Sequence, residues 1–512
     1  MKRTSNGVVV LTVVSVFLPA EGKDLTDRER EGVKRHAGPA TGPAGTCGLT
    51  CIGNVRHRRS EEISGSPWGV SCHWITDKHD LTTEQQLEQL ATLGAKWGFL
   101  VPNWDLIETR KGTYDWNGPA HRLDDAVHGM VRRKISPIIQ IYGGNRLYTP
   151  VSPVDVPPGV EVPKLTTDSQ AKKAWFAWIE ALVRRYCAHV KVWEVWNEPN
   201  TEWFWKPKPD PQLYGRMVKE VAQIVRSVDS QAIILAGSTA HMPLDFLRGF
   251  LESEGADSFN FWSVHPYADR PEQTEDDIRR VQEVLASYKK SPVVWQSECG
   301  FPSNADTAGW GYGGPWDEVK HAKWLLRRFL CDASIGMKVS IYFVLNDYPA
   351  LLEGGPRKGR MGINRKGLHS GESWERKPAA HAFANLAALI DDRFETKRLR
   401  LDFAVVEPGP YAPVSARNLR TCTYIEKQTG APMICYWLDV PMRTETKAGT
   451  IRLGRVDQEM RQPVLVDLLD GRVYEAVGRR STDGSIVFDA LPLADSPLVL
   501  CSASVVPLSQ TK

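Results

Sequence analysis

Two glutamates, each at the end of a short apolar run, are the residues of this chain best suited to chemistry. Residues 193–199 read WEVWNEP and include Glu198, and residues 294–300 read VWQSECG and include Glu298. Two carboxylates on separate strand ends can cleave a glycosidic bond between them. One donates a proton to the leaving oxygen, and the other attacks or stabilises the cationic sugar carbon. The pair therefore predicts acid–base and nucleophilic chemistry at a sugar.

The residues around Glu198 have roles that follow from strand geometry. Side chains alternate along a strand, so Glu194, Trp196 and Glu198 are expected on one face. If Glu198 projects into the mouth of a barrel, Glu194 lies deeper and is predicted to be a buried structural carboxylate in a polar network. Asn197, adjacent to Glu198, is positioned to donate a hydrogen bond to a substrate hydroxyl.

The elements that must position these glutamates alternate between β-rich and amphipathic segments from residue 67 onward. In the segment 170–186, for example, apolar residues recur at three- and four-residue spacing, which predicts a helix. Eight strands, each followed by a helix, predict a (β/α)₈ barrel, whose catalytic groups lie at the C-terminal ends of its strands. The two glutamates end the fourth and seventh of the predicted strands: 69–74, 96–102, 136–142, 192–197, 232–236, 259–265, 293–298 and 339–345.

The rest of the chain divides into three further parts. Residues 1–22 carry Lys2 and Arg3 before an apolar run that is too short to cross a bilayer, which predicts a signal peptide and export, either secreted or periplasmic. Residues 23–66 have no sustained apolar period and are predicted to be a low-order leader. After the catalytic barrel, 67–392, short strands separated by Gly, Asp and Pro turns predict a β-sandwich accessory domain over 393–507.

Composition excludes several classes of function. The net charge of +3 gives no case for a nucleic-acid partner, and no segment after the N-terminus is long and apolar enough for a transmembrane helix. The nine cysteines form no paired Cys-x-x-Cys motif, so no structural zinc site is predicted. Cys422 and Cys435 lie in flanking strands and could be bridged in an oxidising compartment. Oligomeric state is not determined by these features.

The motif around Glu198 resembles a known group of enzymes. The string WNEP at 196–199, with a second glutamate ending the seventh strand, looks like the retaining glycoside hydrolases of clan A. Residues 104–116, WDLIETRKGTYDW, and 262–267, WSVHPY, are most similar to family 39, the group of β-xylosidases, α-L-iduronidases and exopolysaccharide hydrolases. The resemblance covers about residues 67–507 and implies an oligosaccharide or polysaccharide substrate.

Carried over position by position, the resemblance implies a catalytic pair and its neighbours. Glu198 would be the general acid/base, and Glu298 the nucleophile of a double displacement. Asn197 would bind the 2-hydroxyl of the sugar, and His265 and Tyr267 would lie near the two carboxylates. Tyr267 would hydrogen-bond Glu298 and help to keep it ionised. Such an enzyme requires no cofactor and no metal.

One departure from the family pattern concerns the nucleophile. Clan A members usually carry an arginine on the second strand that contacts this residue. Here residues 97–102 read WGFLVP, with Phe99 near the expected position. The resemblance therefore implies that another donor orients Glu298, or that activity is reduced.

Aromatic and amide side chains in or just after the predicted strand ends are candidates for sugar contacts, with packing as the alternative for each. They are Trp74, Trp104, Tyr142, Asn145, Trp203, Trp205, Trp310 and Asn346. The run 203–205, WFW, follows Glu198 closely and is the best candidate for a stacking wall. The glycine-rich run 309–314 lacks the Lys-Ser/Thr of a phosphate loop.

Two other functions remain compatible with these residues. A carbohydrate-binding barrel without turnover would account for the absent arginine but not for the presence of both carboxylates. A transglycosylase would use the same two glutamates and differ only in whether water or a sugar hydroxyl resolves the intermediate. The chain has no Gly-x-Ser-x-Gly and no His-Glu-x-x-His motif, so a serine or metallo-hydrolase is not supported.

Overall fold

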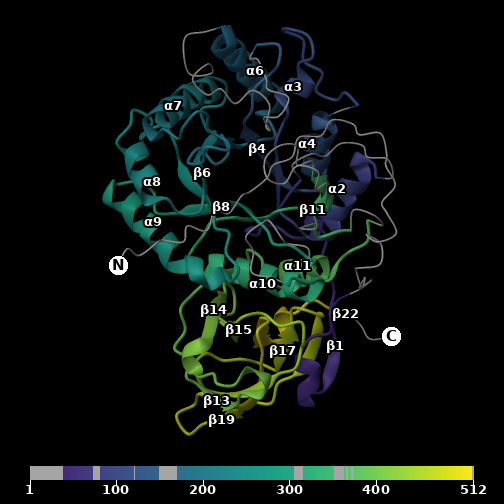
Figure 1. The fold of residues 1–512 in the computed structure, drawn as a ribbon. Helices are drawn as coiled ribbons and strands as arrows, with labels where there is room; N and C mark the ends of the chain where they lie inside the picture. The colour runs from purple at the N-terminus through teal and green to yellow at the C-terminus, as the bar shows by residue number, and fades with distance from the viewer. Residues whose placement is uncertain are drawn as a thin grey trace.

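The structure, a computed structural model, describes residues 39–72, 81–119, 121–148, 170–304, 315–350, 362–364, 367–370 and 374–509. Figure 1 shows two units, a barrel surrounded by helices and a smaller β-domain that packs beneath it. Helices α10 (Glu318–Ser334) and α11 (Pro378–Leu389) lie between the two units.

Eight parallel strands close into the barrel. Strands that follow one another in sequence are neighbours around the ring, and the last strand pairs with the first, where Ser340 lies beside Trp68. This closed ring confirms the predicted (β/α)₈ fold. The strands are β2 (Trp68–Ser71), β3 (Trp97–Leu100), β4 (Ser136–Ile141), β5 (Val192–Val195), β6 (Ile233–Ala240), β7 (Phe261–His265), β8 (Val294–Cys299) and β9 (Ser340–Tyr342).

Helices cover the outside of the ring and bury an apolar stripe against it. In α6, Trp175, Trp178 and Leu182 are fully buried, as their spacing predicts. Asp210 caps α7 by accepting hydrogen bonds from two backbone N–H groups of its first turn. Apart from α10 and α11, the helices of the barrel are α2 (Thr83–Thr92), α3 (Trp104–Ile107), α4 (Leu123–Arg132), α6 (Gln170–Tyr186), α7 (Pro211–Val228), α8 (Leu244–Leu251) and α9 (Glu275–Ser287).

Strand β6 is longer than predicted because it contains a bulge. The register against β7 shifts between Ala236 and Thr239, and both intervening residues have positive φ, 104° at Gly237 and 48° at Ser238. A Cβ at Gly237 would lie 2.5 Å from the carbonyl oxygen of Ser263, so only glycine fits there. The bulge turns the Ser238 side chain toward the interior of the barrel, where it meets Gln140 and His265.

The second unit is the predicted β-sandwich. One sheet has the order β12 (Phe394–Thr396), β14 (Leu419–Glu426), β15 (Pro432–Leu438), β21 (Leu498–Ser502), β17 (Pro463–Asp467), β18 (Arg472–Glu475), β1 (Cys51–Val55), β22 (Leu508–Ser509). The other has the order β13 (Phe403–Glu407), β16 (Gly449–Val456), β20 (Ile486–Leu493), β19 (Arg479–Arg480). Buried side chains such as Tyr436, Leu453 and Phe488 fill the space between them. A short hairpin, β10 (Tyr348–Ala350) and β11 (Gly362–Asn364), follows β9.

Part of the predicted low-order leader is a strand of this sandwich, so that prediction was wrong for residues 39–66. Strand β1 pairs with β18 and with β22, and Figure 1 shows it beside strands from the far end of the chain. Ala44 is fully buried, and its N–H donates to Asp467 at 3.0 Å. A five-residue strand whose partners lie more than 400 residues away leaves no local period to detect. Residues 1–38, with the predicted signal peptide, lie outside the described residues.

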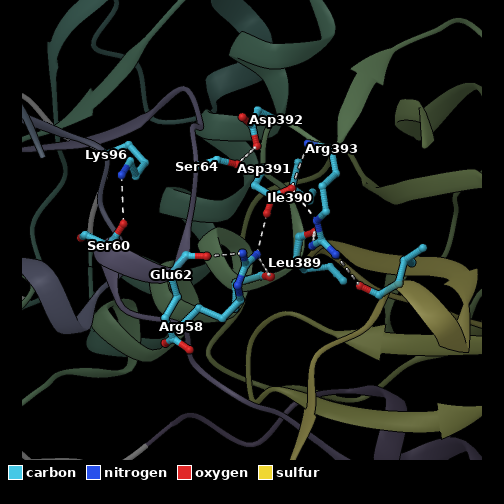
Figure 2. A network of polar contacts seen from close by, with 12 residues as sticks. Arg58, Ser60, Glu62, Ser64, Lys96, Leu389, Ile390, Asp391, Asp392 and Arg393 are labelled. Carbon is cyan, nitrogen blue, oxygen red and sulfur yellow. Dashed lines mark hydrogen bonds and ion pairs between the residues drawn. The ribbon is translucent and has the colours of Figure 1, made fainter. Parts of the chain in front are cut away.

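Polar contacts then hold the N-terminal segment against the barrel, as Figure 2 shows. Arg58 Nη1 lies 2.5 Å from Asp391 Oδ2, and Asp391 also pairs with Arg393 at 2.8 Å. Lys96 Nζ donates to the carbonyl oxygen of Ser60 at 2.9 Å. The segment that leaves the sandwich at β1 is thus bound to the barrel at two places, just before β3 and just after α11.

Charged residues of α10 are buried where the barrel meets the sandwich. Arg327 pairs with Glu272 through two contacts of 2.7 Å, and Trp437 of the sandwich donates to the same carboxylate at 2.6 Å. Lys323 pairs with Asp495 of the sandwich at 2.7 Å. Removing one partner of a buried ion pair leaves the other charge uncompensated. The sandwich therefore completes the burial of α10.

The structure bears on the possible disulfide and on membrane helices. Cys422 and Cys435 lie directly opposite each other on β14 and β15, as the sequence suggested, but both are buried free thiols. Within the described ranges, none of the helices has the length and apolar character that crossing a membrane requires.

One buried histidine makes a testable contribution to acid stability. His121 Nε2 accepts a hydrogen bond from the backbone N–H of Asn103 at 3.0 Å, and burial lowers the pKa of His121 from 6.5 to about 4. The unfolded chain binds this proton near pH 6.5, so the histidine's contribution is complete above that pH and is lost as the pH falls toward 4. Relative to His121→Gln, the wild type should lose about 3 kcal/mol of unfolding free energy between pH 7 and pH 4. Urea unfolding of both proteins across that range measures the difference, and parallel pH profiles would contradict it.

Candidate active site

Glu198 follows β5 in a strained turn at the C-terminal end of the barrel. Trp196 has φ 70° and Glu198 has φ 42°, which side chains other than glycine seldom adopt and which is frequent at functional sites. The turn ends the alternation of the strand, so the predicted shared face was wrong for Trp196. Its ring packs outside the barrel against Trp175 of α6, whereas Glu194 lies inside. The side chain of Glu198 is 2% exposed.

Glu298 lies within β8, and its side chain is buried. Tyr267 lies two residues after the end of β7, and its hydroxyl donates to Glu298 Oε1 at 2.8 Å. Phe99, at the position where the family pattern led us to expect an arginine, is a buried residue of β3. Tyr267 is therefore one donor that orients Glu298.

The two glutamates come together with His265, the last residue of β7. Single ligand atoms of Glu198, His265 and Glu298 all lie within 4.8 Å of one another. His265 Nδ1 is 3.0 Å from Glu198 Oε1, and its Nε2 is 3.1 Å from the Ser238 hydroxyl. In the part of the chain that the structure describes, these three are also the one group of such side chains close enough to hold a metal ion. The absence of a metal requirement stays a prediction.

Beneath the glutamates lies a polar network that sequence reasoning identified only in part. Glu194 accepts hydrogen bonds from the Ser263 hydroxyl at 2.6 Å and from Gln140 Nε2 at 2.9 Å. Burial raises the pKa of Glu194, although His265 and the hydrogen bonds oppose the rise. Gln140 was missed, and the signal that could have found it is a single polar residue within the apolar run of β4. Ser238 had no sequence signal, because its position depends on the bulge in β6.

Asn197 lies at the edge of this network with one polar group unused. Its Oδ1 is 3.3 Å from Gln140 Nε2. Its Nδ2 is buried and has no hydrogen-bond partner among the described residues. Buried amide groups are nearly always paired, so an unpaired donor beside Glu198 marks a place where a ligand can accept a hydrogen bond.

The candidate sugar contacts differ in where the structure places them. Burial, together with the nearby charge of Glu198, raises the pKa of the Tyr142 hydroxyl well above the usual range. Trp203, which is partly exposed, packs along the edge of the core. Trp74 and Trp310 lie outside the described residues.

Four other candidates make structural contacts. Asn145 Nδ2 donates to the backbone oxygens of Trp104 at 3.1 Å and Glu108 at 2.9 Å. Trp104 donates to Glu108 and is buried against Trp178 of α6. Trp205 is buried between Trp196 and Tyr214, so the run 203–205 does not form an open stacking wall. Asn346 donates to Gln89 of α2 at 3.0 Å. An aromatic residue just beyond a strand end can turn into the site or into the outer layer, and packing decides which.

Removing the Tyr267 hydroxyl tests its role in orienting Glu298. A hydrogen bond to a charged group contributes about 1.5–3 kcal/mol. On the glycosidase mechanism that the sequence predicts, Tyr267→Phe should therefore lower kcat/KM on an aryl glycoside about ten- to hundredfold. Tyr288→Phe is a matched control, because the Tyr288 hydroxyl donates to Glu252 on the surface at 2.9 Å. Equal activities of the two variants would contradict the proposed role of Tyr267.

Comparison with known proteins gives similarity at the level of the fold. No protein-family model matches the chain, and no curated protein sequence matches it. A family 39 glycoside hydrolase from the gut symbiont Bacteroides cellulosilyticus WH2 superposes with a TM-score of 0.62 and 20% identity over 88% of this chain and 83% of that one. A monomeric β-xylosidase from Caulobacter crescentus CB15 has a TM-score of 0.55 and 15% identity over 89% and 98% of the two chains.

A third solved structure, the family 39 enzyme from Xanthomonas axonopodis pv. citri, has a TM-score of 0.55 and 16% identity, over 91% of this chain and 97% of that one. In all three comparisons the match extends across both the barrel and the sandwich, because it spans close to nine-tenths of the chain. The chain therefore has the fold of the family 39 glycoside hydrolases.

Proposed function

We propose that this protein is a retaining glycoside hydrolase in which Glu198 is the general acid/base and Glu298 the nucleophile. The observation that carries the proposal is the approach of the two carboxylates at the strand ends, with oxygen atoms within 4.8 Å of each other. Retaining enzymes have carboxyl groups about 5–5.5 Å apart, whereas inverting enzymes leave about 6.5–9.5 Å for a water molecule. The shared fold supports the same class of reaction.

The reaction proceeds in two displacements. Glu298 attacks the anomeric carbon as Glu198 protonates the departing oxygen, which forms a glycosyl–enzyme ester and releases the leaving group. Glu198, now ionised, removes a proton from water, and the water attacks the same carbon from the opposite side to Glu298. The ester bond breaks, the sugar leaves with its original configuration, and both glutamates return to their starting states.

The neighbouring residues serve this cycle. Tyr267 holds Glu298 for attack through the bond of 2.8 Å, and His265 fixes one oxygen of Glu198 at 3.0 Å. Asn197 Nδ2 is placed to donate to the sugar hydroxyl beside the reacting carbon, where hydrogen bonds strengthen in the transition state. None of these steps uses a cofactor.

The substrate is an oligosaccharide or polysaccharide, and β-xylosides are the first probes to use because a β-xylosidase is among the proteins of similar fold. We also propose that the protein is exported, because Lys2 and Arg3 precede an apolar run typical of a signal peptide.

Trapping the glycosyl–enzyme tests the mechanism directly. A panel of 2-deoxy-2-fluoro aryl glycosides, beginning with the β-xyloside, is incubated with the protein, and the intact mass and peptide map are recorded. We expect a mass gain of one fluorosugar, located on Glu298. A label on another residue would overturn the assignment. Partition of the labelled enzyme between water and an added sugar acceptor then distinguishes a hydrolase from a transglycosylase.

A further inference from the structure

We infer that Glu194 and Gln140 are positioning residues that set which way the side-chain amide of Asn197 faces, and so place an N–H donor in the active site. The inference deepens the proposed function, and rests on it only in taking a sugar hydroxyl as the group that this donor meets. Neither residue touches the reacting atoms, and both act through Asn197.

The first link runs from the carboxyl group of Glu194 to Gln140. Glu194 is fully buried in the barrel, with Ser263 Oγ 2.6 Å from its Oε1 and Gln140 Nε2 2.9 Å from its Oε2. Oε2 is an acceptor when the group is ionised, and it remains one when a proton resides on Oε1. In both of these states Gln140 presents its NH₂ group, not its carbonyl oxygen, to Glu194.

The second link runs from Gln140 to Asn197. Gln140 Nε2 also lies 3.3 Å from Asn197 Oδ1 and 3.3 Å from the Ser238 hydroxyl. Nε2 carries two hydrogens and accepts none. Glu194 accepts one hydrogen, and Asn197 Oδ1 and Ser238 Oγ share the other, so the Asn197 atom that faces Nε2 is oxygen. The carboxyl group of Glu194 thus determines the orientation of the Gln140 amide and, through it, the orientation of the Asn197 amide.

The consequence lies on the far side of Asn197. With Oδ1 directed toward Gln140, Nδ2 points away from the network, where it is buried and has no partner in the described part of the chain. A buried donor without a partner is unfavourable until a ligand accepts from it. A reversed amide would instead place an oxygen beside the carboxylates of Glu198 and Glu298, and would add negative potential where the sugar binds.

The kinetic test compares glycosides with and without the 2-hydroxyl. Glu194→Gln keeps the shape but lets the paired amides face either way, and Gln140→Met removes the donor. On 2,4-dinitrophenyl β-D-xyloside, each variant should lose about ten- to hundredfold in kcat/KM, against less than about threefold on the 2-deoxy analogue. Equal losses on both substrates would overturn the inference.

A matched control separates positioning from general loosening of the strands. The Tyr214 hydroxyl donates to the carbonyl oxygen of Val195 at 2.8 Å and accepts from the N–H of Gly237 at 2.8 Å. Tyr214→Phe therefore removes hydrogen bonds to β5 and β6 but leaves the contacts among Glu194, Gln140 and Asn197 unchanged. This control variant should change kcat/KM on both substrates by the same factor.

Neutron diffraction gives a readout that needs no turnover. In deuterium-exchanged crystals of the wild-type protein, we expect two deuterons on the Asn197 atom that points away from Gln140, and two on the Gln140 atom that faces Glu194. An oxygen at either position would overturn the inference. If the wild type cleaves no glycoside while these deuterons are present, the proposed function fails and the amide orientation stands.

Discussion

Glu298→Ala should lower kcat/KM by at least about 10⁴-fold on any glycoside that the wild type cleaves, because no covalent intermediate can form. The substitution leaves a cavity beside Tyr267, whose hydroxyl loses its acceptor at 2.8 Å. A small anion can occupy that cavity. Sodium azide should therefore restore turnover of a 2,4-dinitrophenyl glycoside and give a glycosyl azide of inverted configuration, identified by its proton coupling constants.

The stereochemistry of this product is the critical observation. Azide that attacks from the position of the missing carboxylate reaches the face opposite the leaving group, so inversion is required. A retained product from Glu298→Ala would place the nucleophile elsewhere. Unchanged activity, in a variant with an unchanged circular dichroism spectrum and thermal midpoint, would also contradict the assignment.

Glu198→Ala should have an effect that depends on the leaving group. A poor leaving group needs protonation, so kcat/KM should fall about 10²- to 10⁴-fold on an alkyl glycoside or a disaccharide. A dinitrophenolate departs without a proton, and kcat/KM on that glycoside should fall by less than about tenfold. Steady-state kinetics across a series of leaving groups of graded acidity measures the contrast.

The same variant should accumulate the glycosyl–enzyme, because no general base activates water. A burst of dinitrophenol followed by slow turnover is expected, and azide should accelerate the slow phase. The azide product should retain configuration, since the ester to Glu298 remains and azide attacks its opposite face. Inverted product, or an equal loss on all leaving groups, would exclude Glu198 as the acid/base.

Much of this site could be predicted because its key information is local. The run that ends near Glu198 and the run that includes Glu298 each have strand composition and a following turn residue. All strands of a parallel barrel point the same way, so residues at their C-terminal ends meet at one edge wherever the strands fall in sequence. His265 and Tyr267, which the resemblance implied as neighbours, lie against the carboxylates at the end of β7.

Local patterns did not place residues whose surroundings come from distant segments. Strand β1 has five residues, and its neighbour β18 begins at Arg472, so only the assembled sandwich shows that it is a strand. Trp104 and Trp205 have the same local signals as a sugar-stacking residue, yet both rings are buried in the outer layer. The direction of such a ring is decided by which neighbours leave space for it.

The sequence by itself determined the class of fold, and it predicted the two carboxylates and their chemistry, because periodicity and motif are properties of short segments. Only the tertiary structure decided how the carboxylates are held. Gln140 of β4, Glu194 of β5, Ser238 of β6 and Ser263 of β7 come from four strands and meet inside the barrel. Hydrogen bonds depend on distances of about 3 Å between side chains. Those distances are set by barrel closure and the bulge in β6, not by the order of residues along the chain.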